Sequence, residues 1–258
     1  MSANIHPTAI VDIGAEIGSD VVIGPHAVIE DDVVIGRGSI IKAGALIARG
    51  SRLGEEVRVF SYAVAGTIPQ DLKFGGEETT LEIGDRTVIR EFVTLNRGTK
   101  ETGKTTIGSD CLLMSYSHVA HDCIVGDHCI LANSATLAGH VTLGDWVIIG
   151  GLVPIHQFVK IGCHVMIGGG WRVPKDVPPY VTAAGSPLKP MDINKIGLKR
   201  RGFSDETVSQ LRKAHKILFR SDTDMKSSLE TLDSMGDLGP EVEYFKSFIR
   251  SSERGVIM

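Results

Sequence analysis

His121 and Asp122 are the residues of this sequence most able to do chemistry, and they stand next to each other. A histidine beside a carboxylate can act as a general base near neutral pH, because the anion orients the imidazole and favours the protonated form through which it passes. Three more histidines, His118, His140 and His156, lie in the same part of the chain. No other stretch concentrates these residue types, so we expect a proton-transfer site here.

A six-residue repeat determines how these side chains are positioned. Every sixth residue from Ile5 to Val59 is aliphatic, and the same frame resumes at Ile83 and again from Ile107 to Val173. The fourth residue after each aliphatic is nearly always small or β-branched, so both positions must face inward. A period of six fits neither a helical turn nor the simple alternation of a strand. The chain must therefore form a short strand and then turn, six residues at a time.

Three such segments close one turn of a prism. This is typical of a hexapeptide parallel β-helix, with about 18 residues per coil and roughly 4.8 Å between coils. Residues one coil apart then lie above one another. The frame predicts three adjacent columns: Ala120, Ala138 and His156; His121, Gly139 and Gln157; Asp122, His140 and Phe158. Because glycine allows close approach, the Gly139 backbone N–H could stabilise the oxyanion of an acyl transfer.

Two interruptions of the repeat predict loops. The in-frame positions become charged at about 66–82 and 96–106, so the chain must bulge out of the coil there. Loops of this kind usually carry function. We refer to these segments as the first and second excursions.

A change of period marks the end of the coil. The paired prolines of Asp176–Tyr180 indicate a boundary, and from about residue 190 the apolar period is helical, with Ser204 as an N-cap. Further helices are expected at roughly 224–235 and 240–253. We predict a mainly β fold, with a parallel β-helix of hexapeptide repeats over residues 1–187 and a small C-terminal α-helical subdomain over residues 188–258.

The composition excludes two classes of protein. The formal net charge is −4, and no stripe of Lys and Arg runs through the long first part of the chain, which argues against a nucleic-acid binder. No apolar run approaches the roughly 18–20 residues needed to span a bilayer, and the N-terminus lacks a secretion signal. We therefore expect no membrane span and a cytoplasmic location.

Metal binding is the alternative use of the histidines. Zinc needs three or four ligands that converge at about 2.0–2.1 Å, and His118-x-x-His121 is a loose match to that requirement. A zinc-dependent β-helix enzyme, such as a carbonic anhydrase of the same coil type, is therefore an alternative. We expect no metal and no cofactor. The cysteines at the small inward position, Cys111, Cys123 and Cys129, are expected to be free thiols in a reducing cytoplasm.

Several sequence blocks together resemble one family. They are Ile5–Ile10, Pro69–Lys73, Ile89–Glu91, Asn96–Thr99, His118–Cys123, Leu137–Val141, His156–Phe158, Asp176–Tyr180 and Gly197–Phe203. On these blocks, which span nearly the whole chain, the sequence resembles the UDP-N-acetylglucosamine acyltransferases of lipid A biosynthesis, trimeric left-handed β-helix enzymes. The resemblance implies that a 3-hydroxyacyl chain moves from acyl carrier protein to the 3-position of UDP-N-acetylglucosamine, or of its 3-amino analogue. This is the first step of lipid A assembly.

The resemblance also implies roles for individual residues. His121 matches the general base, Asp122 its support, and Gly139 the oxyanion donor. Further positions match the binding of the sugar nucleotide and the acyl donor: Asp71, Lys73, His118, His140, His156 and Gln157. Near the nucleotide phosphates, the matching residues are Asn194, Arg200 and Arg201.

Gly169 matches the position that measures acyl length, where glycine leaves the groove long. Its column with Gly151 forms part of a strip without side chains, although turns that need a positive φ would explain these glycines equally well. One departure is visible, because Ile196 stands where members of the family commonly carry an acidic residue.

Two kinds of partner follow from the resemblance. The first is a homotrimer, with sites in clefts between subunits. The second is the acidic acyl carrier protein, which could dock on a basic segment whose alternative interpretation is a solvated helix face. That segment consists of Lys199, Arg200, Arg201, Arg212, Lys213, Lys216 and Arg220.

Two rival functions remain at the level of the sequence. One is another hexapeptide acyltransferase, either dependent on acetyl-CoA or acting later in lipid A assembly on an acylated sugar. Later enzymes usually carry an extra N-terminal domain, whereas the repeat begins here at Ile5. The other rival is a β-helix scaffold without catalytic activity, and the cluster of His121, Asp122 and Gly139 speaks against it.

Overall fold

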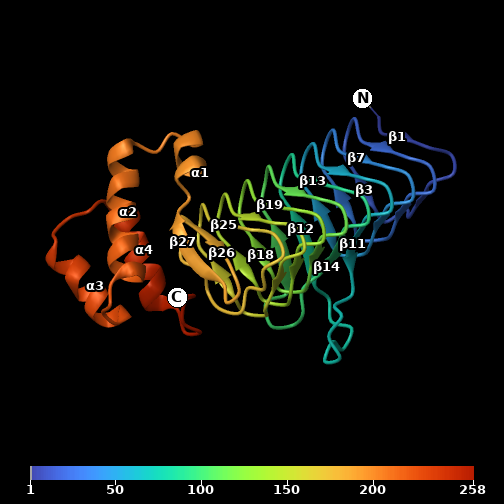
Figure 1. Cartoon of the computed structure of the whole chain (residues 1–258). Helices are drawn as coiled ribbons and strands as arrows, with labels where there is room; N and C mark the ends of the chain where they lie inside the picture. Colours follow the sequence, from blue (N-terminus) through green and yellow to red (C-terminus); the bar gives the residue numbers. More distant parts are fainter. Residues whose placement is uncertain (1) are drawn as a thin grey trace.

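The repeat forms a stack of short parallel strands that is followed by four helices (Figure 1). The computed structural model describes residues 2–258. The strands form three sheets, which we name A, B and C. Successive segments visit A, B and C in turn, so the predicted parallel β-helix is confirmed.

Sheet A has eleven strands. They are β1 (Asn4–Ile5), β4 (Val22–Ile23), β7 (Ile40–Ile41), β10 (Arg58–Val59), β13 (Val88–Ile89), β16 (Leu112–Leu113), β19 (Ile130–Leu131), β22 (Ile148–Ile149), β25 (Met166–Ile167), β26 (Val181–Ala184) and β27 (Lys189–Ile193).

Sheets B and C have eight strands each. Sheet B contains β2 (Ile10–Val11), β5 (Val28–Ile29), β8 (Leu46–Ile47), β11 (Val64–Thr67), β14 (Thr94–Asn96), β17 (His118–Val119), β20 (Thr136–Leu137) and β23 (Pro154–Ile155). Sheet C contains β3 (Glu16–Ile17), β6 (Val34–Ile35), β9 (Ser51–Leu53), β12 (Thr80–Ile83), β15 (Lys104–Ile107), β18 (Ile124–Val125), β21 (Thr142–Leu143) and β24 (Lys160–Ile161).

The strand register agrees with the six-residue frame. Val119 pairs with Leu137, and Leu137 pairs with Ile155, so each coil advances 18 residues. Where an excursion intervenes the step is longer: Val59 pairs with Ile89 across the first excursion. The residues outside strands are 68–79 in the first excursion and 97–103 in the second, so both are narrower than predicted. The first projects from the stack beside β11 and β14 (Figure 1).

The interior of the prism is filled by the aliphatic ladder. Ile41, Leu95 and Leu137 are fully buried, as is the small inward residue Cys129. Each such side chain contributes about 1.5–3 kcal/mol of transfer free energy, before the entropy of ordering is subtracted. The core therefore runs the length of the stack and fixes the coil register that positions the corners.

The corners repeat one backbone conformation. We call the turns from sheet B to sheet C the BC corner, and name the AB and CA corners in the same way. Asp122, His140 and Phe158 occupy equivalent places in successive BC turns, with φ of 59°, 63° and 63°. Because these turns share one conformation, their side chains project in the same direction, one coil above the other.

Four helices follow the stack: α1 (Lys195–Arg200), α2 (Asp205–Arg220), α3 (Met225–Ser234) and α4 (Pro240–Ser251). The Ser204 side chain accepts a hydrogen bond from the Thr207 N–H at 3.0 Å, so the predicted N-cap is confirmed. No helix among residues 2–258 is long and apolar enough to cross a membrane. The predicted division at residue 187 stays a prediction, because β27 pairs with β26 and so prolongs sheet A beyond that point.

Candidate active site

The predicted columns meet at the BC corner. His121 and Asp122 follow β17, Gly139 and His140 follow β20, and Gln157 follows β23. The strand register stacks these turns one coil apart, as the repeat predicted. The corner therefore brings the imidazole, the carboxylate and the glycine of the candidate site together.

His121 and Asp122 form a hydrogen-bonded pair. The Nδ1 atom of His121 lies 2.7 Å from Oδ2 of Asp122. The side chain of Asp122 is fully buried, whereas 15% of the His121 side chain is exposed. With Nδ1 donating to the carboxylate, Nε2 is left to accept a proton from a substrate, which is the arrangement that a general base needs.

The second excursion surrounds the Asp122 carboxylate with donors. The Thr99 N–H donates to Oδ1 at 2.9 Å, and the Thr99 hydroxyl donates to Oδ2 at 2.7 Å. The Thr102 hydroxyl also donates to Oδ1. Burial acts to raise the pKa of Asp122, but the hydrogen bonds from Thr102, His121 and Thr99 outweigh it and hold the pKa at about 2. The carboxylate is therefore an anion throughout the neutral range.

Gly139 lies against the His121 ring. A Cβ atom at this position would come within 2.6 Å of Cε1 and 2.8 Å of Nε2 of His121. Any larger residue would therefore displace the imidazole. Among the described residues, the Gly139 N–H has no hydrogen-bond acceptor, so it is available to a substrate oxygen.

The other predicted histidines differ in their surroundings. His140 stacks on Phe158 with ring centroids 4.4 Å apart, and its Nε2 lies 3.2 Å from Oε2 of Glu101. Nδ1 of His118 lies 2.7 Å from the Thr94 hydroxyl, and burial lowers the pKa of His118. Nδ1 of His156 lies 3.1 Å from the carbonyl oxygen of Gln157. His140 is in contact with the pair: its ring centroid lies 5.2 Å from that of His121, and its Nε2 lies 3.6 Å from Oδ2 of Asp122.

The two excursions and the BC corner enclose a cleft of about 520 Å³. Asp71 and Lys73 line it from the first excursion, where Oδ1 of Asp71 accepts the Lys73 N–H at 3.0 Å. The Lys100 N–H donates to Oε1 of Glu77 at 3.2 Å, which joins the two excursions. The full lining is Gln70, Asp71, Leu72, Lys73, Phe74, Glu77, Thr99, Lys100, Glu101, His121, His140, Gln157 and Phe158.

The remaining predicted residues lie elsewhere in the chain. Asn194, Arg200 and Arg201 line a second hollow of about 980 Å³ between sheet A and α1. The two hollows share no residue. In a single chain, the structure therefore separates Asn194, Arg200 and Arg201 from the residues of the cleft.

Each residue of the second hollow is held differently. The Asn194 side chain accepts from the Gly197 N–H and donates to the His164 carbonyl, so it caps α1. The Arg201 guanidinium lies over the Trp146 ring, 4.9 Å from the centroid. Arg200 is exposed and forms no ion pair with a described residue, which leaves it free to bind an anion. Ile196 also lines this hollow and is 68% exposed.

Gly169 lies at the AB corner, outside both hollows. A Cβ atom here would meet the Gly151 carbonyl oxygen at 3.1 Å and the Gly151 backbone nitrogen at 3.5 Å. Gly151 and Gly169 therefore stack without side chains between them, but the Trp171 ring lies against Gly168, and neither Gly151 nor Gly169 lines the cleft.

The structure also contains a group that could hold a metal ion. Ligand atoms of His121, Asp122 and His140 lie within 4.8 Å of one another. The Asp122 oxygens, however, already accept hydrogen bonds from Thr99, Thr102 and His121. The donor set therefore suits a hydrogen-bonded pair better than a zinc centre, whose ligands must turn toward the ion.

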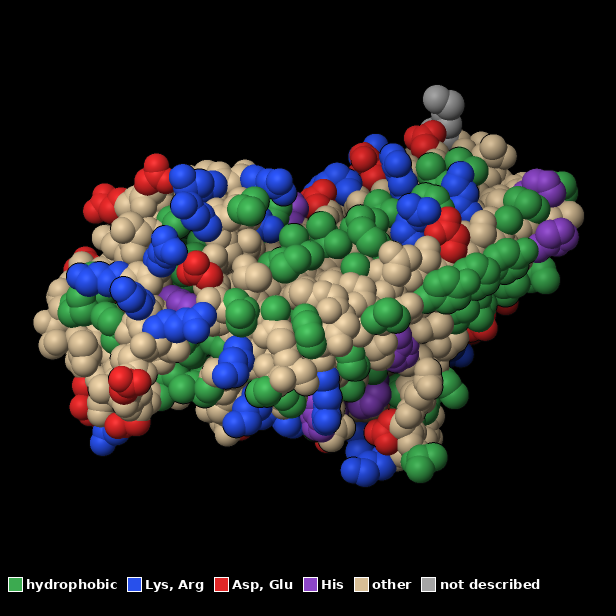
Figure 2. Space-filling model, in the orientation of Figure 1, with side chains coloured by type: hydrophobic (Ala, Val, Ile, Leu, Met, Phe, Trp, Pro, Cys, Tyr) green, Lys and Arg blue, Asp and Glu red, His purple; other side chains and the backbone are tan. Residues whose placement is uncertain are grey.

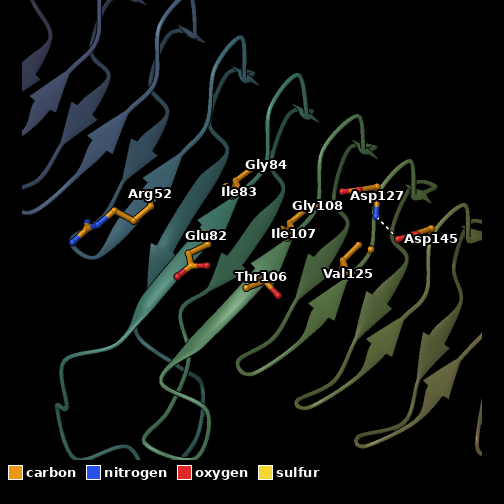
Figure 3. Close-up of a pocket in the computed structure, with 11 residues that line it drawn as sticks. Arg52, Glu82, Ile83, Gly84, Thr106, Ile107, Gly108, Val125, Asp127 and Asp145 are labelled. Carbon is orange, nitrogen blue, oxygen red and sulfur yellow. Dashed lines mark hydrogen bonds between the residues drawn. The ribbon is translucent and has the colours of Figure 1, made fainter.

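A third hollow, of about 400 Å³, lies on the outer face of sheet C (Figure 3). Two of its carboxylates serve the backbone: Oδ1 of Asp127 accepts the Ser109 N–H, and Oδ1 of Asp145 accepts the Asp127 N–H. The other labelled polar side chains, Arg52, Glu82 and Thr106, lie apart from this pair along the sheet (Figure 3). Its lining includes no histidine or cysteine, and its third carboxylate, Glu82, pairs with Lys104 at 3.0 Å.

Sequence reasoning missed the threonines of the second excursion. Thr99 fell in a block that resembles the family but received no role, and Thr102 was not considered. The sequence offered one signal of their role: both carry hydroxyl groups in a loop whose in-frame positions are charged. What the sequence did not show was that this loop folds back onto Asp122.

The fold and the His121–Asp122–Gly139 arrangement define a hexapeptide-repeat transferase. The family model for the bacterial transferase hexapeptide (six repeats) matches residues 14–49 and 104–139. The model for UDP N-acetylglucosamine O-acyltransferase, domain 2, matches residues 176–257.

Solved structures narrow the class. LpxA, a UDP-N-acetylglucosamine acyltransferase from Bacteroides fragilis, is 46% identical, with a TM-score of 0.97, and the match covers 98% of this chain and 100% of that one. LpxA from Acinetobacter baumannii is 43% identical, with a TM-score of 0.94 and 98% and 99% coverage. The UDP-N-acetylglucosamine acyltransferase from Campylobacter jejuni is 41% identical, with a TM-score of 0.93 and 99% coverage of both chains. The chain belongs to the UDP-N-acetylglucosamine acyltransferase family.

Proposed function

We propose that this acyltransferase moves a 3-hydroxyacyl chain from acyl carrier protein to the 3-position of UDP-N-acetylglucosamine or its 3-amino analogue. This is the opening reaction of lipid A biosynthesis. The observation that carries the mechanism is the His121–Asp122 pair, which faces a cleft beside the unpartnered N–H of Gly139.

The residues at the BC corner supply the proton transfer and the contact to the oxyanion. Nε2 of His121 takes the proton from the acceptor group at C3 while that group attacks the thioester carbonyl. The new bond forms at the carbonyl carbon, and the Gly139 N–H stabilises the resulting oxyanion. When the C–S bond breaks, His121 returns the proton to the departing thiolate. Asp122 stabilises the imidazolium between these steps.

The position of each residue supports its proposed role in binding the sugar nucleotide or the acyl donor. Asp71, Lys73, His140 and Gln157 line the cleft, where they contact the sugar and the acyl donor. His118 lies on β17 and His156 directly follows β23, next to Gln157, and neither lines the cleft. Arg200 holds the nucleotide phosphates, because a guanidinium presents paired donors to phosphate oxygens. Asn194 and Arg201 shape that second hollow.

A complete site requires a second copy of the chain, and the homotrimer supplies it. The outward side chains of sheet A are largely apolar and lie exposed or half-buried: Val22, Ile40, Val88, Leu112, Ile130, Ile148 and Met166. At the AB corner, Tyr62, Phe92 and Tyr116 form an exposed aromatic stack with centroids 5.6 and 5.1 Å apart. Such a patch is typical of a subunit interface. Sheet A of one copy then faces the BC corner of the next.

Acyl carrier protein docks on the C-terminal helices. Lys213 and Lys216 are exposed on α2 and form no ion pair with the described residues. Figure 2 shows Lys and Arg side chains gathered over this part of the molecule. A surface of this charge attracts an acidic partner and accelerates its association.

Product analysis tests the proposal. Purified protein is incubated with 3-hydroxyacyl carrier proteins and either UDP-N-acetylglucosamine or the 3-amino sugar, and the products are examined by mass spectrometry. We expect a UDP-sugar that has gained one 3-hydroxyacyl group. Transfer from acetyl-CoA alone, or only to an already acylated sugar, would instead support the rival acyltransferases.

A further inference from the structure

The second excursion contributes little to the core of the β-helix. Of its residues outside strands, only Gly98 and Thr99 are buried, and neither carries an apolar side chain. The coils on both sides remain in register, since Leu95 pairs with Val119 and Ile107 pairs with Val125. The excursion is therefore not explained by packing of the ladder.

What the excursion contacts is the Asp122 carboxylate. Thr99 supplies two donors, its N–H at 2.9 Å and its hydroxyl at 2.7 Å, and Thr102 supplies a third through its hydroxyl. The loop is itself held in place. The Thr79 hydroxyl donates to the Gly98 carbonyl at 2.6 Å, and the Gly103 N–H donates to the Thr99 carbonyl at 2.8 Å.

A carboxylate without these donors would behave differently. In a buried position an anion that lacks partners takes up a proton or turns toward another donor. Either change would release Nδ1 of His121 and let the imidazole rotate away from Gly139. Nε2 of His140, which lies 3.6 Å from Oδ2 of Asp122, could then replace Nδ1 of His121 as the partner of the carboxylate.

We propose that Thr99, assisted by Thr102, is a positioning residue that holds Asp122 as a fixed partner for Nδ1 of His121. This rests on the proposed function, because it assigns a task to the pair that the reaction uses. Thr99 acts through His121 and does not touch the substrate's reacting atoms.

The test compares Thr99→Val with Thr99→Ser. Valine removes the hydroxyl but keeps the backbone N–H and the shape, whereas serine keeps both donors. We expect the kcat of Thr99→Val to fall at least about tenfold, the effect of losing a hydrogen bond to a charged group, with the KM for the UDP-sugar changed less than about twofold. Thr99→Ser should restore most of the rate. Thr142→Val, on the outer face of sheet C, is the matched control and should be as active as the unsubstituted enzyme.

A double-mutant cycle separates positioning from general structural damage. If Thr99 acts through the imidazole, Thr99→Val should have no further effect on the residual rate of His121→Ala. Equal losses of rate in both backgrounds, or a kcat of Thr99→Val within twofold of the unsubstituted enzyme, would overturn the proposal. A His121→Ala variant with full activity would instead reject the proposed function itself, so the two failures are distinguishable.

Discussion

The proposed chemistry depends on one buried anion, the Asp122 carboxylate. Asp122 has no contact with solvent, yet its pKa is held at about 2 because donors from Thr102, His121 and Thr99 outweigh the effect of burial. The sequence predicted the pairing of His121 with Asp122 and the place of Gly139, because adjacent residues and residues one coil apart must meet. It could not predict Thr99 and Thr102, since loop conformation does not follow from a repeat.

Replacing the base is the direct test at this scale. His121→Ala should lower the transfer rate at least about a hundredfold, the low end for removal of a general base, because His121 is the imidazole that the buried Asp122 carboxylate orients for the acceptor proton. Thermal stability should change little, since the ring is partly exposed in the cleft. Turnover near that of the unsubstituted enzyme would discard the mechanism.

The Asp122 carboxylate also links stability to pH. Because the folded-state pKa of Asp122 lies below its ordinary value, the ionised carboxylate contributes to the free energy of unfolding above about pH 4. This contribution is lost as the pH falls toward 2. A shift of this size corresponds to about 2 kcal/mol. Relative to the unsubstituted protein, Asp122→Asn should show a lower urea midpoint at pH 7. That difference should shrink as the pH is lowered from 5 toward 3; a difference independent of pH would contradict the linkage.

At the scale of the element, the six-residue frame predicted nearly every strand. The inward positions are compatible with no other fold, because an aliphatic residue at each sixth place can be buried only if the chain turns three times per coil. The lengths of the excursions were overestimated, since Leu81 and Thr105 remain in strands β12 and β15. Charge at an in-frame position marks where the ladder is interrupted but does not show how early pairing resumes.

Two neighbouring residues on one strand test how much burial in the aliphatic ladder contributes to stability. In β21, Leu143 points into the core with 1% exposed, and Thr142 points outward. Leu143→Asp should lower the free energy of unfolding by more than about 4 kcal/mol, because it buries an unpaired charge. Thr142→Asp should cost less than about 1 kcal/mol. Similar urea midpoints for the two variants would contradict the inward assignment of Leu143.

At the scale of the whole molecule, one chain holds the two groups of residues that we propose to form a shared site. The BC corner carries the base, and the hollow beside α1 carries Arg200. The sequence placed all of these residues in one site through resemblance. It could not show that they lie apart in the same chain, because Arg200 belongs to α1, which lies outside the coil repeat.

Subunit complementation tests whether the site is shared. His121→Ala and Arg200→Ala should each be nearly inactive alone. After the two proteins are mixed, unfolded and refolded together, mixed trimers should regain a measurable fraction of the activity, because some interfaces then combine an intact base with an intact arginine. If each chain builds its own site, mixing should restore nothing beyond the sum of the two residual rates.

The coil keeps its register on both sides of each interruption, as the pairing of Val59 with Ile89 shows. A segment inserted at a corner therefore leaves the scaffold above and below it unchanged. The buried ladder stabilises the protein, whereas the corners carry the side chains that can react. Substitutions at a corner can therefore change the chemistry without a change of fold.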